Sequence, residues 1–171
     1  MARRTNDNVT VNEKEEIIVS TKSMPLEDWK KSFLFGYLTN CLANLRLGHV
    51  IINHLRLTLN LSVRTYIEYL IENGQGPVKD MVDTLKGFQD SILASQSSVL
   101  QVPGFGGRYW EPHEAAYLIA SKDPLAFHAE LEALTIDFTG VSMQGVFAAQ
   151  QTESPILGGV GTEQTSYLKA A

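Results

Sequence analysis

Metal binding and nucleophilic catalysis use histidine, cysteine and acidic side chains at particular spacings, and this chain offers few such arrangements. Its four histidines are His49, His54, His113 and His128. His49 and His54 lie five residues apart, whereas a helical metal site of the HExxH type places its two histidines four residues apart. No such motif or carboxylate cluster accompanies them. The sequence therefore predicts capping, packing and surface roles for the histidines, and no metal site.

The chain has one cysteine, Cys41, at an apolar position of the first expected helix. One cysteine cannot form a disulfide within the chain, nor hold an iron–sulfur cluster or a structural zinc by itself. Nothing around Cys41 in the sequence exposes it or lowers its pKa, as a nucleophile requires. We expect a small buried hydrophobic side chain here and assign no catalytic residue.

One segment combines a glycine-rich stretch with a cation and two aromatic rings. Gly104-Phe105-Gly106-Gly107 lacks the GxGxxG and GxxxxGK[ST] spacings of phosphate-binding loops, which favours a flexible hinge. Arg108, Tyr109 and Trp110 follow directly, and such side chains beside a loop can line a ligand surface. We take these three as candidate ligand-binding residues. The alternative is that the aromatic rings anchor the loop onto the helices.

Length and charge restrict the class of protein. With 171 residues and 44% hydrophobic content, the chain has the size and composition of one soluble domain. Its net charge of −5 and pI near 5.3 argue against nucleic-acid binding through phosphate contacts. No signal peptide is visible after Met1, and no apolar run approaches the roughly 18 residues of a membrane-spanning helix. We expect a cytoplasmic protein with no membrane partner.

These residues are positioned by an expected mainly α fold of about six helices, with a short N-terminal β-arm. Apolar residues recur at helical spacing from Leu26 through Trp29, which we expect to be buried, and Gly48 is expected to close this first helix with a positive φ. Ser62 and Asp123 are predicted N-caps. The expected helices span about 25–47, 49–59 and 63–73, then one opened by Pro77 and two shorter ones opened by Pro112 and Pro124.

Three regions follow from the composition. Residues 1–14 are polar and are expected to be a flexible N-terminal segment, and residues 15–134 form the helical domain. Residues 16–21 are rich in β-formers and predict either an edge strand of a larger assembly or an extended arm on the helices. Residues 135–171 contain many Gly, Thr, Ser and Gln without a sustained period, which predicts a disordered tail.

Two segments of the chain resemble a known family. Residues 16–29, EIIVSTKSMPLEDW, resemble the stretch that follows the catalytic barrel in cobalamin-binding-type radical SAM (S-adenosylmethionine) proteins. There an "i-V-x-T-x-S-M" segment leads to an "x-E-D-W" helix start and a long aromatic-rich helix, which matches Phe33-Leu34-Phe35-Gly36-Tyr37 here. Residues 110–116, WEPHEAA, are similar to a "W-x-P-x-E-A" helix start later in the same region. The resemblance covers about residues 3–134.

The resemblance implies a helical C-terminal accessory domain that helps to form or cover the substrate pocket of a separate radical SAM catalytic chain. S-adenosylmethionine, the iron–sulfur cluster of the CxxxCxxC motif and cobalamin belong to domains absent from this chain, so none is expected to bind here. The chain is then a fragment, a split gene product or a stand-alone descendant. The alternative is a stand-alone helical module that binds a protein or a small ligand.

Overall fold

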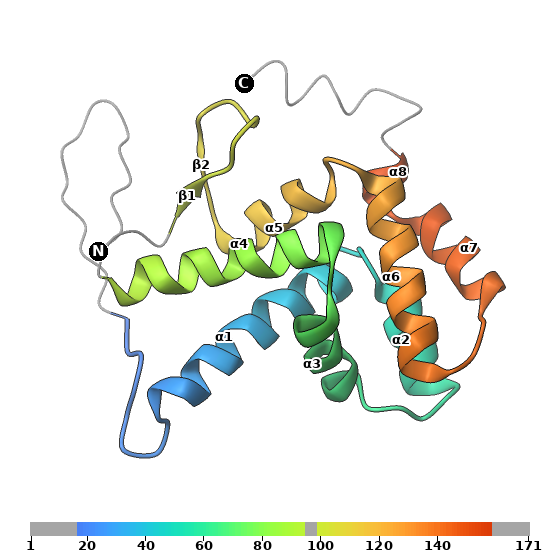
Figure 1. Ribbon diagram of the computed structural model, residues 1–171, viewed down its shortest axis with the longest axis horizontal. Coiled ribbons are helices and arrows are strands. Elements are labelled where there is room, and N and C mark those ends of the chain that lie inside the picture. Colours follow the sequence, from blue (N-terminus) through green and yellow to red (C-terminus); the bar gives the residue numbers. More distant parts are fainter. Residues whose placement is uncertain (1–16, 95–98, 159–171) are drawn as a thin grey trace.

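The computed structural model describes residues 17–94 and 99–158 and is mainly helical (Figure 1). The N-terminal segment 1–14 and residues 159–171 of the expected tail lie outside the described residues. The elements, in chain order, are α1 (Leu26–Thr39), the π-helical turn η1 (Asn40–Asn44), α2 (His49–Leu57), α3 (Val63–Asn73), α4 (Gly76–Leu93), β1 (Leu100–Gln101), β2 (Tyr109–Trp110), α5 (Pro112–Ala120), α6 (Pro124–Thr139), α7 (Gln144–Glu153) and α8 (Pro155–Gly158).

Several helices begin where the sequence predicts, because local side chains satisfy the first backbone N–H groups. Ser62 accepts a hydrogen bond from the Thr65 N–H at 3.3 Å, and Asp123 accepts one from the Ala126 N–H at 3.0 Å. Both predicted N-caps are therefore confirmed. Helix α5 begins with a capping box, in which the Glu114 side chain accepts from the Glu111 N–H at 3.0 Å.

Helix α4 lies at the centre of the fold and packs against α1, α3, α5 and α6. It has more buried side chains than the other described helices, including Val78, Met81 and Leu85 with no exposed surface. The main core continues into α2, α3 and α6 (Figure 1). Among the described residues, no helix has both the length and the apolar character to cross a membrane.

The end of the first helix differs from the prediction. Helix α1 stops at Thr39, and the chain continues through the wider η1 turn to Arg46, which has the positive φ of 62°. Gly48 has φ −152°, so the prediction that it closes the helix with positive φ is wrong. Glycine fits there because an added Cβ would lie 3.1 Å from Leu42 Cδ2 and 3.5 Å from Leu131 Cδ2.

The expected N-terminal β-arm does not form in residues 17–21. This segment has no strand, and its first backbone hydrogen bonds form a turn in which the Thr21 and Met24 N–H groups each donate to the other's carbonyl. The strands among the described residues are β1 and β2, which pair with each other in antiparallel register, Leu100 opposite Trp110. The segment is rich in β-formers, but the described part of the chain places no strand beside it with which it could pair.

Residues 135–158 are folded, which corrects the prediction of a disordered tail from residue 135. Helix α6 continues to Thr139 and ends at Gly140, whose φ of 70° makes it a C-terminal glycine cap. Helices α7 and α8 follow, so the described part has eight α-helices instead of about six. Phe147 and Ile156 from these helices are buried in the main core. Because Phe147 and Ile156 stand in a stretch of mostly polar residues, their spacing does not produce a helical period that could be recognised in the sequence.

Candidate functional site

The glycine-rich segment forms the turn of the β1–β2 hairpin. Gly104, Gly106 and Gly107 have φ angles of 91°, 72° and 68°, which side chains other than glycine rarely adopt. The Gln101 side-chain amide donates to the Gly107 carbonyl at 2.7 Å across the turn. The three glycines are thus required by the turn itself, and no helix N-terminus follows them directly as in a phosphate-binding loop.

The three predicted ligand-binding residues differ in exposure. Arg108 and Tyr109 are exposed, and 59% of the Tyr109 side chain is accessible to solvent. Trp110 points to the other face of the strand and packs on a small second core around Phe88 and Leu118. Its indole Nε1 is buried without a hydrogen-bond partner among the described residues. Trp110 therefore anchors the hairpin, and ligand binding by Arg108, Tyr109 and Trp110 stays a prediction.

An open groove of about 490 Å³ lies beside the hairpin, between α4 and the junction of α5 and α6. It contains three carboxyl groups and one ammonium group. The lining residues are Pro77, Asp80, Asp83, Thr84, Pro103, Ile119, Lys122 and Asp123. Pro103 belongs to the hairpin segment, and Lys122 also lies over the Phe105 ring at 5.9 Å from its centroid. The hairpin turn thus borders a groove that residues 108–110 do not line.

Two of the three groove carboxylates already have partners within the fold. Asp83 pairs with Lys79 and Lys86, and the hydrogen bond from Lys79 is the main cause that lowers the pKa of Asp83. Asp123 accepts the capping bond of α6. Among the described residues, no group of three or more His, Cys, Asp or Glu side chains is placed to hold a metal ion. An open groove with such a lining has the character of a binding surface.

Sequence reasoning assigned ligand binding to none of the groove residues and so missed this groove. None of its residues belongs to a sequence motif that indicates ligand binding. The groove exists only because α4 meets the end of α5 and the hairpin turn, a tertiary arrangement without a local signal.

Cys41 is completely buried, as predicted. Its Sγ donates to the His113 carbonyl at 3.6 Å, and burial raises the pKa of the thiol to about 12. A thiol in this environment remains protonated at neutral pH and does not act as a nucleophile.

The four histidines lie apart and serve different contacts. His113 stacks on the Tyr37 ring, with 6.3 Å between the centroids, and His54 is half-buried on α2. His128, on α6, is 3% exposed and its Nε2 lies 2.8 Å from Ser154 Oγ. Burial lowers the pKa of His128 to about 4. His49 contacts Glu153, with 2.9 Å between Nε2 and Oε2. These are packing and bridging roles.

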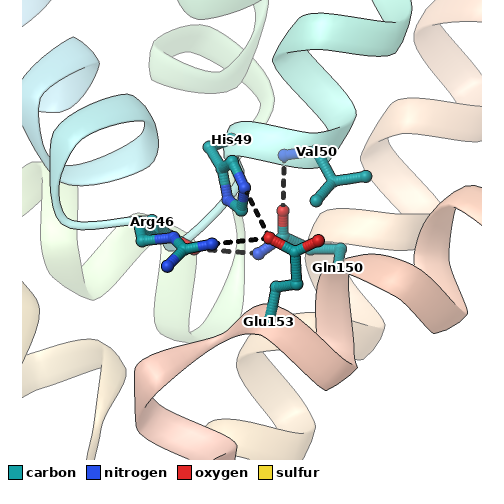
Figure 2. A network of polar contacts seen from close by, with 5 residues as sticks. All are labelled: Arg46, His49, Val50, Gln150 and Glu153. Carbon is teal, nitrogen blue, oxygen red and sulfur yellow. Dashed lines mark hydrogen bonds and ion pairs between the residues drawn. The ribbon is translucent and has the colours of Figure 1, made fainter.

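A polar network joins α7 to the start of α2 (Figure 2). The buried Gln150 side chain accepts from the Val50 N–H and donates to the Arg46 carbonyl, both at 2.9 Å. Glu153 lies one turn further along α7 and bridges Arg46, at 2.6 Å, and His49. These bonds satisfy backbone groups at the irregular connection where Arg46 has positive φ. Sequence reasoning missed the network because it placed Gln150 and Glu153 in a disordered tail.

Comparison of the chain with protein-family models, with curated proteins and with solved structures found no match in any of the three. The family resemblance of residues 16–29 and 110–116 therefore stays a prediction.

Proposed function

We propose that this chain is a helical accessory domain of a radical SAM-type enzyme, which covers or completes the substrate pocket of a separate catalytic chain. The S-adenosylmethionine, iron–sulfur cluster and cobalamin of such an enzyme would be bound by that other chain. The proposal combines the family resemblance of residues 16–29 with one structural observation, the exposure of apolar side chains in that same segment.

The exposed apolar side chains are Ile17, Ile18 and Leu26, which are 44%, 71% and 37% accessible. The described residues give Ile17–Ser20 no backbone hydrogen-bond partner. A β-rich segment with free backbone groups can add as an edge strand to a partner's sheet, where main-chain bonds supply affinity. Full burial of one isoleucine side chain stabilises a complex by roughly 1.5–3 kcal/mol.

Helix α1 continues this surface. Only Trp29 and Leu38 are buried on α1, while Phe33, Leu34 and Phe35 are half-buried. Helices with apolar residues around most of their circumference are typically covered on more than one side. In Figure 1, α1 lies against α4 and α3, and its N-terminal half extends beyond the helices α2, α6 and α7. We therefore propose that the catalytic chain contacts α1 and the segment before it.

The first experiment is to read the source DNA next to this gene for a frame with the CxxxCxxC motif and to co-express the two chains. The proposal expects a complex by size-exclusion chromatography and native mass spectrometry. Ile18→Asp should weaken it at least about tenfold, because a charge would replace a buried apolar group. Leu57→Asp, at an equally exposed position (72%) on α2, is the matched control and should leave the complex intact. No complex, or equal weakening by both variants, would overturn the proposal.

The groove favours a second candidate function, a stand-alone module that binds a small ligand. Because Asp83 is paired with Lys79 and Lys86, a small cationic ligand would be held by the other two carboxyl groups of the groove, Asp80 and Asp123. Spermidine is a suitable probe, and amide NMR shifts at Thr84 and Lys122 are the measurement. Saturable shifts there, together with a monodisperse chain that no radical SAM partner alters, would favour this function over the first.

A further inference from the structure

Helices α7 and α8 are held on the rest of the fold by buried apolar side chains, Phe147 and Ile156 among them, and by polar contacts at their adjoining ends. Gln150 and Glu153 bind the start of α2, and Ser154, between the two helices, binds His128 of α6. We define these three side chains, Gln150, Glu153 and Ser154, as the polar latch. Helix α7 packs on α2, and α8 packs on α6 (Figure 1).

We propose that α7 and α8 form an acid-sensitive clamp, held over α2 and α6 by the polar latch, which detaches when His128 is protonated. His128 is 3% exposed and Ser154 is 2% exposed, so both side chains are shielded from water while the helix pair stays in place. A charged imidazolium in that position loses its hydration, and Ser154 Oγ alone does not replace it. Protonation thus favours the detached form.

Other charged groups near the clamp need separate consideration. Helices α7 and α8 carry one charged side chain, Glu153, which faces Arg46 and His49. Protonation of Glu153 would weaken that contact, and protonation of His49 would strengthen it. The remaining charged groups on the helices packed against the clamp are His54 and Arg56 on α2 and Glu130, Glu132 and Asp137 on α6. Of these, Glu130 binds the first N–H groups of α4, and Asp137 binds the Tyr69 hydroxyl.

The expected size of the effect follows from proton linkage. With the ordinary pKa of 6.5 in the detached form and a pKa of about 4 in the closed form, His128 favours detachment roughly 20-fold more at pH 5 than at pH 7. The sign follows from the lowered pKa: the detached form binds more protons, so closure weakens as the pH falls.

Hydrogen exchange of the full chain, read by mass spectrometry and corrected for intrinsic rates, tests the clamp. At both pH values α7 and α8 should be less protected than α4, because they open without global unfolding, and between pH 7 and pH 5 their protection should fall roughly 20-fold. If α7 and α8 were as well protected as α4 at pH 5, they would exchange only through global unfolding, and the proposal would be overturned. This comparison uses the wild-type chain alone, so it stands even where a variant fails to fold.

Three variants assign the effect to a residue. His128→Gln keeps a hydrogen-bonding group but cannot be charged, and it should abolish the difference between pH 7 and pH 5. His113→Gln, the matched control away from α7 and α8, should keep it, and so should Glu153→Gln, which removes the Glu153 charge. A pH effect that survives His128→Gln, or one that Glu153→Gln abolishes, would overturn the assignment to His128.

Discussion

The hydroxyl groups of Tyr66 and Thr135 lie 2.7 Å apart in the core, where each side chain is at most 1% exposed. Thr135 donates its own hydrogen to the Leu131 carbonyl at 2.6 Å, so Tyr66 is the donor to Thr135 Oγ1. This bond joins α3 to α6 through the first residue of the segment that sequence composition assigned to a disordered tail. Because the contact is buried, substitutions at Tyr66 and Thr135 test whether α6 is folded at this position.

Removing the acceptor should cost more than removing the donor. Thr135→Val leaves the buried Tyr66 hydroxyl without a partner and should lower the free energy of unfolding by about 1–3 kcal/mol. Tyr66→Phe should cost about 1 kcal/mol, and in the double variant the two losses should be less than additive. Urea unfolding of the four proteins gives this cycle. A Thr135→Val protein within about 0.5 kcal/mol of wild type would contradict the buried bond.

Two glycines in the corrected region should respond in opposite directions. Gly140 has φ 70°, so Gly140→Ala should destabilise the protein by about 1 kcal/mol. Gly145 lies inside α7 with open space around its Cα, so Gly145→Ala should stabilise by about 0.5–1 kcal/mol. Thermal unfolding of both variants provides the comparison. If neither substitution changed the stability, residues 140–145 would be unfolded, as the composition suggested.

What the sequence predicted well is local. The Ser62 and Asp123 caps depend on side chains that bond to backbone three residues away, so their type and position are sufficient to identify them. The helical periods of α3 and α4 likewise follow from spacing along one element. Gly140 follows the apolar residues of α6 and so had a similar local signal. The polar composition of the residues after it led instead to the prediction of a disordered tail.

What the sequence did not predict depends on distant contacts. The Gln150 side chain donates a hydrogen bond to the backbone carbonyl of Arg46, 104 residues earlier in the chain, and no pattern within α7 indicates this partner. Trp110 was predicted as a ligand-surface residue, with a hairpin anchor as the alternative, and its anchoring role becomes visible only through its packing with Phe88 and Leu118. The groove also arises where separate elements meet, so its residues carry no common motif.

Trp29 is confirmed as buried, at 9% exposure, and packs on Phe33 with 5.3 Å between ring centroids. Trp29→Ala should lower the free energy of unfolding by about 3–5 kcal/mol, because a large cavity replaces the indole. Leu57→Ala, at a side chain that is 72% exposed, is the control and should change it by less than about 0.5 kcal/mol. An equally small effect at Trp29 would place the ring on the surface.

Cys41 should be unreactive in the native protein. With its pKa raised to about 12 by burial, the thiolate fraction at pH 8 is on the order of a thousandfold lower than that of a free cysteine. Ellman's reagent should therefore react slowly with the native chain and rapidly in 6 M guanidinium chloride, as about one thiol per chain. Raising the pH from 7 to 9 should leave the native rate governed by opening of the core, because the buried thiol stays protonated over that range. If the native and the denatured chain reacted with Ellman's reagent at the same rate, Cys41 would be exposed and would have to be considered as a nucleophile.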